Sequence, residues 1–281
     1  MVGGRDLGER VRRLYIPLAV FVVLMLFPFY WMLITSIKPN RELYSQKVMP
    51  LLVYQPTLKH YVDLLTETNS LTWTYNTMLV AVVTTVVSVV LGTMIAYPLA
   101  RMRFPGAAVV AIGVAATYLV PQPLLFIPMS DIINRLELGN TLTAVMLTYP
   151  TLLIPFSAWL LMGYFKSVPR ELEEAARIDG ASRLQAMTRI VLPLCTPGLL
   201  SAGIFSFTLA QNEFLYALIF LAKSEVRTVP IGVVTELIRG DVFYWGQLMA
   251  GALLGSVPVA IIYSFFVDYY VAGLTAGSVK T

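Results

Sequence analysis

The sequence has very few of the residues that carry metal and redox chemistry. Its 281 residues include one cysteine, Cys195, and one histidine, His60. A single cysteine cannot form a disulfide within the chain, and a single histidine cannot supply a histidine-based metal site or catalytic relay without other residue types. We therefore expect a chain that holds no metal ion and no cofactor and has no catalytic residue of its own.

Charge is also scarce. Charged residues make up 13% of the chain and hydrophobic residues 57%, whereas a soluble domain is about 25% charged. The net charge of +4 would suit nucleic acid, but the basic residues lie in short loops and at the ends of apolar segments instead of in one stripe. This composition predicts a polytopic membrane protein in contact with lipid, and it argues against a nucleic-acid-binding protein.

Long apolar segments are present where charge is missing. A helix needs about 20 apolar residues to cross a hydrocarbon core of roughly 30 Å. We expect membrane-spanning helices at residues 14–36, 73–98, 106–128, 140–164, 198–221 and 247–271. The segments lack the alternating polar pattern of a membrane β-barrel, and a backbone in lipid must satisfy its own hydrogen bonds. The prediction is an all-α bundle of six transmembrane helices.

The distribution of Lys and Arg predicts how this bundle is oriented. With six spans, one side receives Arg101, Arg103, five basic residues from Lys166 to Arg189, and the arginines before the first span. Basic residues in short loops mark the cytoplasmic side. The expected layout is a cytoplasmic N-terminus at 1–13, a membrane domain at 14–271 with an external loop at 37–72 and a cytoplasmic loop at 165–197, and a cytoplasmic tail at 272–281.

The cytoplasmic loop is too polar and too regularly spaced for a simple turn. Pro169 can open a helix, glutamates in its first turn complement the helix dipole, and Gly180 can end it. Glu173 and Arg177 are four residues apart, the spacing of a helical ion pair.

A second short helix is expected to follow the first. Ser182 and Gln185 have the spacing of a capping box, and this helix should run to about Val191 before Pro193 ends it. An apolar stripe should pack this loop against the bundle; it consists of Leu184, Met187, Ile190 and Val191.

At these residues the sequence resembles the integral membrane subunits of bacterial ATP-binding-cassette (ABC) importers. Their cytoplasmic signature is Glu-Ala-Ala, three residues, Gly, nine residues, then Ile-x-Leu-Pro. The matching residues are Glu174, Ala175, Ala176, Gly180, Ile190, Leu192 and Pro193. The six-span layout and the ending at 273–280 look like the carbohydrate-uptake branch, especially the smaller permease similar to the second subunit of maltose transporters.

The resemblance implies both a mechanism and a set of partners. The helix up to Gly180 would be a coupling helix that docks into a groove on an ATPase, with Glu171, Glu174, Ala175, Ala176, Asp179 and Gly180 at the contact and Ile190, Leu192 and Pro193 shaping the loop. The complex would contain a second permease as a heterodimer, two ATPase subunits that bind ATP and Mg, and an external solute-binding protein, in a bacterial cytoplasmic (inner) membrane. The sequence agrees, since it has no Gly-x-x-x-x-Gly-Lys-Ser/Thr loop to hold nucleotide phosphates.

The fifth apolar segment contains polar residues that are expensive to place in lipid. They are Gln211, Asn212 and Glu213, with Tyr216 close behind. The family often has Trp-Asn-Glu-Phe here, so Gln211 departs from the pattern. We expect these residues to form a hydrogen-bonding wall or gate of the translocation path, or a polar contact with the partner permease.

The expected substrate is a sugar or a related polyol. No Lys or Arg lies in the middle of a predicted span, which disfavours this chain as the main binder of a phosphate or sulfonate group. Four other side chains could stack on or bond to a hydroxyl-rich ring, or could instead anchor helices at the membrane interface: Tyr118, Gln122, Tyr149 and Trp159.

Two other classes compete with this interpretation. An ion-coupled secondary transporter would act without an ATPase, but such proteins usually contain inverted repeats and midplane charges, and here Glu213 is the one candidate coupling residue. An intramembrane hydrolase would need a motif such as His-Glu-x-x-His or Gly-x-Ser-x-Gly, and the sequence contains neither.

Overall fold

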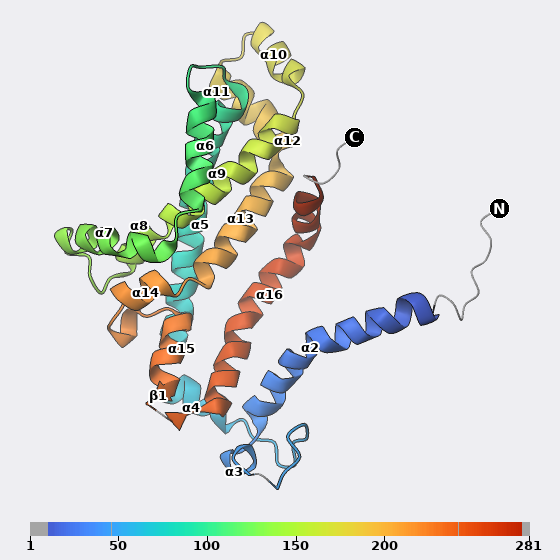
Figure 1. The fold of residues 1–281 in the computed structure, drawn as a ribbon, viewed down its shortest axis with the longest axis vertical. Coiled ribbons are helices and arrows are strands. Elements are labelled where there is room, and N and C mark those ends of the chain that lie inside the picture. Colours follow the sequence, from blue (N-terminus) through green and yellow to red (C-terminus); the bar gives the residue numbers. More distant parts are fainter. Residues whose placement is uncertain (1–10, 46, 241, 277–281) are drawn as a thin grey trace. The chain divides into compact units, whose positions relative to one another are not determined.

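The computed structural model of the protein describes residues 11–45, 47–240 and 242–276. Almost all of these residues lie in helices (Figure 1), and the strands β1 (Ile238–Arg239) and β2 (Val242–Phe243) form one short antiparallel hairpin. The all-α prediction is confirmed. The outer parts of the two predicted cytoplasmic ends, 1–10 and 277–281, lie outside the described residues.

The chain divides into two compact units. The first consists of residues up to Ser70 together with Val233–Val257, and the second consists of Leu71–Gly232 together with the residues from Pro258 onward. The first unit contains a π-helical turn (Val11–Tyr15), α2 (Ile16–Ile37), α3 (Asn40–Leu43), α4 (Lys59–Glu67), the β-hairpin and the start of α16 (Trp245–Ala276).

Polar contacts order the predicted external loop 37–72 in the first unit. The carboxylate of Glu42 accepts hydrogen bonds from the backbone N–H groups of Tyr54 and Gln55. The ring Nε2 of His60, which is buried, lies 2.7 Å from the carbonyl oxygen of Lys38. The lone histidine therefore has a structural partner in this loop.

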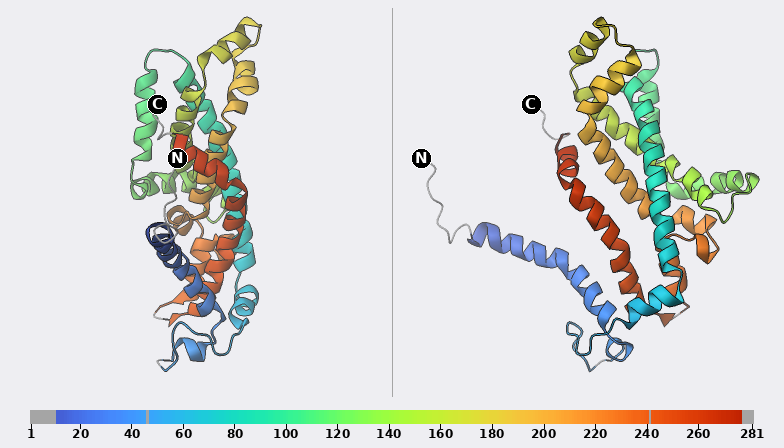
Figure 2. Two further views of the ribbon diagram at one scale, coloured as in Figure 1. Left: turned by 90° about the vertical axis from the view of Figure 1, so that its right-hand side faces the viewer. Right: turned by 180° about the vertical axis from the view of Figure 1, so that it is seen from behind.

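The second unit contains the remaining helices. In chain order they are α5 (Ser70–Arg101, from its second residue onward), α6 (Ala107–Tyr118), α7 (Gln122–Arg135), α8 (Leu142–Thr148), α9 (Pro150–Ser167), α10 (Arg170–Ile178), α11 (Arg183–Ala186), a π-helical turn (Met187–Val191), α12 (Leu192–Leu194), α13 (Thr196–Gln211), α14 (Leu215–Phe220), a 3-10 turn (Ser224–Val226), the first part of α15 (Val229–Leu237) and the second part of α16. Figure 2 shows α10 and α11 at one end of this unit, and α14 lies toward the other end.

Small residues bring the long helices of the second unit close together. A Cβ atom on Gly92 of α5 would lie 2.8 Å from the Cβ of Ser157 and 3.2 Å from the backbone nitrogen of Ala158, both on α9. The hydroxyl oxygens of Ser157 and Ser206 are 2.9 Å apart, which joins α9 to α13. Membrane helices commonly pack in this way, because burial of apolar surface does not by itself drive helices together in lipid.

The predicted spans correspond to helices of suitable length and composition. Within the described part of the chain, four continuous helices are long and apolar enough to cross a membrane: Arg12–Ile37, Ser70–Arg101, Leu142–Ser167 and Trp245–Val267. Two bent pairs raise the number to as many as six if each pair forms one span: Ala107–Tyr118 with Gln122–Arg135, and Arg183–Leu194 with Thr196–Gln211.

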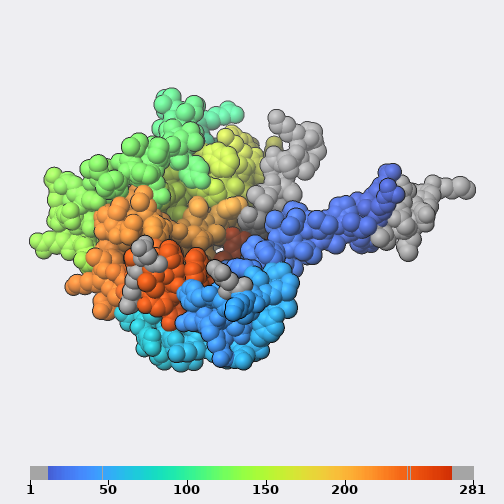
Figure 3. All heavy atoms as spheres, turned by 60° about the horizontal axis from the view of Figure 1, so that its bottom comes forward, coloured from blue at the N-terminus to red at the C-terminus, as the bar shows by residue number. Residues whose placement is uncertain are grey.

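Two of the predicted helices are not continuous. The segment 106–128 bends by 94° between α6 and α7, where Pro121 lacks a backbone donor and disfavours helical geometry at the residue before it. The segment 198–221 is interrupted at 212–214, between α13 and α14. As a result α14 lies against α7 and α8, which Figure 3 shows as orange atoms beside green ones.

Candidate functional sites

The first candidate site is α10, whose two ends form as the sequence predicts. Pro169 precedes the helix in an extended conformation, and Glu171 and Glu173 lie in its first turn. At the other end Gly180 has φ +92°, its N–H donates to the carbonyl of Arg177, and the next N–H donates to the carbonyl of Ala176. This pattern is a Schellman motif, which places a residue with positive φ after the helix and so favours glycine.

The helix that follows is also capped as predicted, but it ends later. The Ser182 hydroxyl accepts from the N–H of Gln185, and the Gln185 side chain accepts from the N–H of Ser182. The helical path then continues through Leu194 instead of ending before Pro193. A π-helical turn at 187–191 immediately precedes this proline, and its wider hydrogen-bond spacing accommodates a residue that cannot donate.

The outer surface of α10 is exposed and partly apolar. None of the residues of this helix is buried, and the exposed fraction is 45% for Leu172 and 86% for Ile178. Leu184 on α11 is 66% exposed, so the prediction that it packs against the bundle is wrong; Ala186 occupies the buried side of that short helix.

The remaining predicted loop residues divide between this surface and the bundle. Among the predicted contact residues, Glu171, Glu174, Ala175, Asp179 and Gly180 are exposed and Ala176 is half-buried. Among the predicted structural residues, Ile190 and Leu192 are half-buried, Leu192 packs against the apolar cluster of the α10 end, and Pro193 is exposed.

The inner side of α10 is fixed to α5 through Glu173, a contact that the sequence did not reveal. Its Oε1 accepts a hydrogen bond of 2.6 Å from the Tyr97 hydroxyl, and its Oε2 lies 3.3 Å from Nε of Arg101. Arg101 also donates from Nη1 to the carbonyl of Val168. Glu173 was expected to pair with Arg177, but it contacts two residues that precede it by more than 70 positions instead. No local sequence pattern predicts contacts between residues so far apart.

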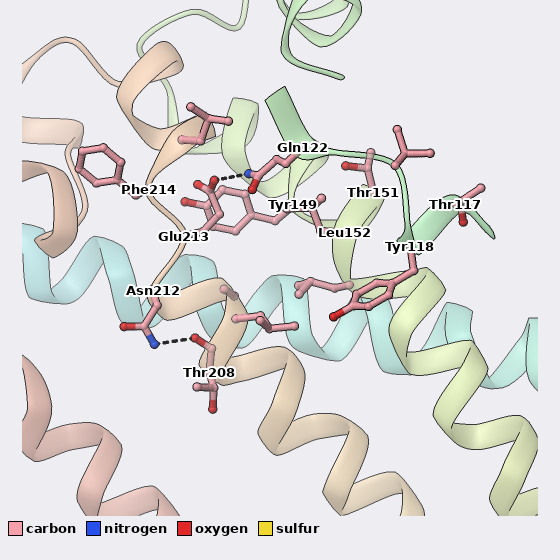
Figure 4. Close-up of a pocket in the computed structure, with 15 residues that line it drawn as sticks. Thr117, Tyr118, Gln122, Tyr149, Thr151, Leu152, Thr208, Asn212, Glu213 and Phe214 are labelled. Atoms are coloured by element: carbon pink, nitrogen blue, oxygen red, sulfur yellow. Dashed lines mark hydrogen bonds between the residues drawn. The ribbon is translucent and has the colours of Figure 1, made fainter. Parts of the chain in front are cut away.

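The second candidate site is a cavity of about 570 Å³ in the second unit (Figure 4), lined by polar groups together with apolar side chains; we call it the polar cavity for the hydrogen-bonding groups in its wall. It lies between the α6–α7 bend, the start of α9 and the end of α13. Its polar lining consists of Thr117, Tyr118, Gln122, Tyr149, Thr151, Thr208, Asn212 and Glu213, and Phe214 adds an aromatic ring. Hydroxyl, amide and carboxylate groups in one cavity suit a ligand with many hydroxyl groups.

Glu213 is held firmly at the edge of this cavity. Its Oε1 accepts from the Gln122 side chain at 2.6 Å and from the N–H of Tyr216 at 2.9 Å, while its Oε2 accepts from the N–H of Ala217 at 3.2 Å. The carboxylate therefore satisfies free N–H groups at the start of α14, where a negative charge is favourable. These bonds explain how the buried carboxylate of Glu213 is tolerated.

The other predicted path residues lie in different positions. Asn212 lines the cavity, and its side-chain amide donates to the carbonyl of Thr208 (Figure 4). Gln211 and Tyr216 are buried and are not part of the lining. Of the four candidate ring-binding residues, Tyr118, Gln122 and Tyr149 line the cavity, whereas Trp159 is exposed and is not part of the lining.

No group of three or more His, Cys, Asp or Glu residues within the described ranges could hold a metal ion.

These features define a class of protein. Helices long and apolar enough to span a membrane, a cavity with polar groups between them, and an exposed helix at one end of the bundle together describe a membrane transport subunit. The family model for the inner membrane component of binding-protein-dependent transport systems matches residues 88–275, and the chain belongs to that family.

Curated relatives cover nearly the whole chain. The sulfoquinovosyl glycerol transport system permease protein SmoH of Agrobacterium fabrum is 36% identical over 267 residues, 95% of this chain and 93% of the relative. The trehalose/maltose transport system permease protein MalG of Thermococcus litoralis is 34% identical over 270 residues, 95% of this chain and 96% of the relative.

A solved structure shares the fold. It is a bacterial ABC transporter involved in the import of the acidic polysaccharide alginate; one of its chains superposes with a TM-score of 0.78 at 21% identity, covering 96% of this chain and all of that chain. The protein is thus a permease subunit of an ABC transporter, as the signature at residues 174–193 predicts. The alternative of an ion-coupled transporter that acts alone is not favoured.

Proposed function

We propose that this chain imports a sugar or a related polyol as one of two permease subunits, driven by two cytoplasmic ATPase subunits, one of which docks on α10. A second, different permease completes the membrane part, and an external solute-binding protein delivers the substrate. ATP and Mg belong to the ATPase subunits. The observation that carries the proposal is an exposed, capped helix with the family signature at one end of a membrane bundle.

The docking contact uses the outer surface of α10 and the turn after it. Leu172 and Ile178 offer apolar contact, and Glu171, Glu174 and Asp179 offer carboxylates to a basic groove. Ala175 and Ala176 allow a close approach, and Gly180 supplies the sharp turn that ends the helix. Charged groups at the edge of such an interface select the partner, while the apolar centre supplies affinity.

The α10 end of the bundle is proposed to face the cytoplasm. The basic residues at this end of the second unit are Arg101, Arg103, Lys166, Arg170, Arg177, Arg183 and Arg189. Short loops rich in Lys and Arg stay on the cytoplasmic side of a bacterial inner membrane. With six spans, both termini lie on that side as well.

The polar cavity is proposed as part of the translocation path. Gln122, Asn212 and Glu213 offer hydrogen-bond donors and acceptors, and the rings of Tyr118 and Phe214 offer flat surfaces for a sugar. The lining contains no Lys or Arg, so this cavity suits a hydroxyl-bearing part of the substrate better than an acidic group. Gln211 and Tyr216 support the path from behind, since both are buried next to the lining residues.

Transport follows from movement of α10 with its ATPase. When two docked ATPase subunits approach each other on binding ATP and separate after hydrolysis, the helices attached to α10 tilt as rigid elements. This tilt opens the path to one side of the membrane at a time. The chain itself takes part in no bond-making step.

The proposal is tested by purifying the chain from its own cells with whatever subunits accompany it. We expect an ATPase to co-purify, and a sugar presented with the external binding protein to stimulate ATP hydrolysis. Glu174→Lys should abolish stimulated uptake while membrane insertion persists, because a cation would face the basic groove. Uptake that continues without an ATPase and collapses with the ion gradient would overturn the proposal.

A further inference from the structure

Helix α5 is attached by polar contacts to two different segments of the second unit, one near each of its ends. At one end it contacts the coupling helix α10, and at the other it contacts the segment 224–229, which follows α14. Asn76 and Arg101 are 25 positions apart in sequence, which corresponds to about 37 Å along an α-helix.

The α5 side of the contact with α10 is buried, whereas the Glu173 side chain is 15% exposed. Both oxygens of Glu173 meet α5, one at the Tyr97 hydroxyl and one at Arg101. The Arg101 side chain is only 2% exposed, and the Tyr97 ring packs edge-on against Phe165. An ion pair with a buried member does not separate easily, because separation would leave a buried charge without its partner.

Apolar burial does not hold α10 in place, since none of its residues is buried. A displacement of α10 therefore acts on α5 through polar contacts, of which Glu173 makes two. Arg101 also bonds to the carbonyl of Val168, and Arg170 at the start of α10 donates to the carbonyl of Ala100 at 3.4 Å. These contacts lie on both sides of Pro98, where α5 lacks one backbone donor. The attachment thus spans the point at which α5 would otherwise bend most easily.

The contact at the other end is equally specific. The Trp73 indole N–H donates to the carbonyl of Ser224, and the Asn76 side chain donates to the carbonyls of Glu225 and Arg227. The Thr77 hydroxyl accepts from the N–H of Val229. All three α5 side chains are buried: Trp73 is 1% exposed, Asn76 4% and Thr77 2%.

We propose that α5 acts as a rigid link, here called the rod, that transmits movement of the coupling helix to the segment 224–229 on the opposite side of the membrane. Tyr97, Arg101 and Glu173 are positioning residues at one end of the rod. Trp73, Asn76 and Thr77 are the positioning residues at the other end of the rod. The inference rests on the proposed function, because an ATPase docked on α10 is what moves the rod.

The test measures whether nucleotide on the cytoplasmic side changes the exposure of residue 225. Glu225 is exposed, and its carbonyl is one of those bound by Asn76. A single thiol is placed there by Glu225→Cys after the native thiol is removed by Cys195→Ala, and the complex with its ATPase is treated with a membrane-impermeant maleimide, with and without a non-hydrolysable ATP analogue.

In this parent complex we expect the labelling rate to change at least about fivefold with nucleotide. Glu173→Gln should remove most of that change, and so should Asn76→Ala. Arg103→Gln, an exposed arginine two residues beyond Arg101, is the matched control and should preserve it. If Glu173→Gln fails to assemble, Tyr97→Phe removes one hydroxyl only and takes its place.

The outcomes separate the two proposals. If no ATPase co-purifies with the wild-type chain, the proposed function itself fails. If the ATPase is present and stimulated, three results overturn the proposed role of α5 alone. They are the absence of a nucleotide-dependent change in the parent, a full change that survives Glu173→Gln (or Tyr97→Phe in its place), and a full change that survives Asn76→Ala.

Discussion

The side-chain amide of Gln122 and the carboxylate of Glu213 meet at 2.6 Å, and each residue lies at an interruption of a helix. Gln122 is the first residue of α7, directly after the bend that follows α6, and Glu213 lies between α13 and α14. The two breaks therefore stabilise each other, and both border the polar cavity. Interrupted helices inside a bundle are tolerated where the freed backbone groups find partners or line a cavity.

Replacement of Glu213 by Gln should destabilise the protein. The variant loses the charge of a group that bonds to two backbone N–H donors and to Gln122, and hydrogen bonds to charged groups contribute about 1.5–3 kcal/mol each. We expect a lower melting temperature in detergent. Asp131→Asn is the control, because its ion pair with Arg135 is highly exposed and should change stability by less than about 1 kcal/mol. Equal melting temperatures for the two variants would contradict the role assigned to Glu213.

Gly92 should tolerate no larger side chain. Even a Cβ atom there would come within 2.8 Å of Ser157 on the facing helix, and overpacking of this kind costs about 1–3 kcal/mol. Gly92→Val should lower the unfolding temperature of the purified protein. Gly163→Val is the matched control, since a Cβ on this helical glycine meets nothing within 4 Å. If Gly163→Val proves the more harmful change, the close approach of α5 and α9 is not what determines stability here.

The turn that ends α10 should require glycine at position 180, because the backbone there has a positive φ. At φ +92° an alanine would be strained, by about 1–2 kcal/mol, although a Cβ would meet no atom within 4 Å. Gly180→Ala should therefore speed hydrogen exchange at the end of α10 and weaken association with the ATPase. Gly139→Ala serves as the control, because Gly139 is exposed and its Cβ would also meet nothing within 4 Å. Unchanged exchange in Gly180→Ala would show that the Schellman turn does not depend on glycine.

Local patterns were enough to predict much of the fold and the docking helix. Long uncharged segments located the spans, since lipid tolerates few alternatives to an apolar helix. Short-range hydrogen bonds explain why the Ser182 capping box and the Gly180 turn could be predicted, because all their partners lie within five residues. The signature Glu-Ala-Ala-x-x-x-Gly identified the family because it combines such local features with a fixed exposed surface.

Contacts between distant residues could not be predicted in the same way. From the sequence, Arg101 served only to predict which side of the bundle is cytoplasmic. The structure pairs it with Glu173, which follows 72 positions later. Gln122 and Glu213 are 91 positions apart, and a carboxylate in an apolar segment fits a gate, a subunit contact or a helix cap equally well. Only the three-dimensional arrangement identifies the start of α14 as the partner of Glu213.

The central claim, that α10 docks on an ATPase, is tested most directly by cross-linking from Ile178, which is 86% exposed and more exposed than Leu172 on the same helix. A photoreactive probe is attached to Ile178→Cys in a Cys195→Ala chain, and the intact complex is irradiated during ATP hydrolysis; Leu136→Cys, which is 54% exposed on the segment after α7, is the control. The account predicts a covalent product with the ATPase from position 178 and none from position 136. A probe at 178 that reacts only with solvent throughout turnover would contradict it.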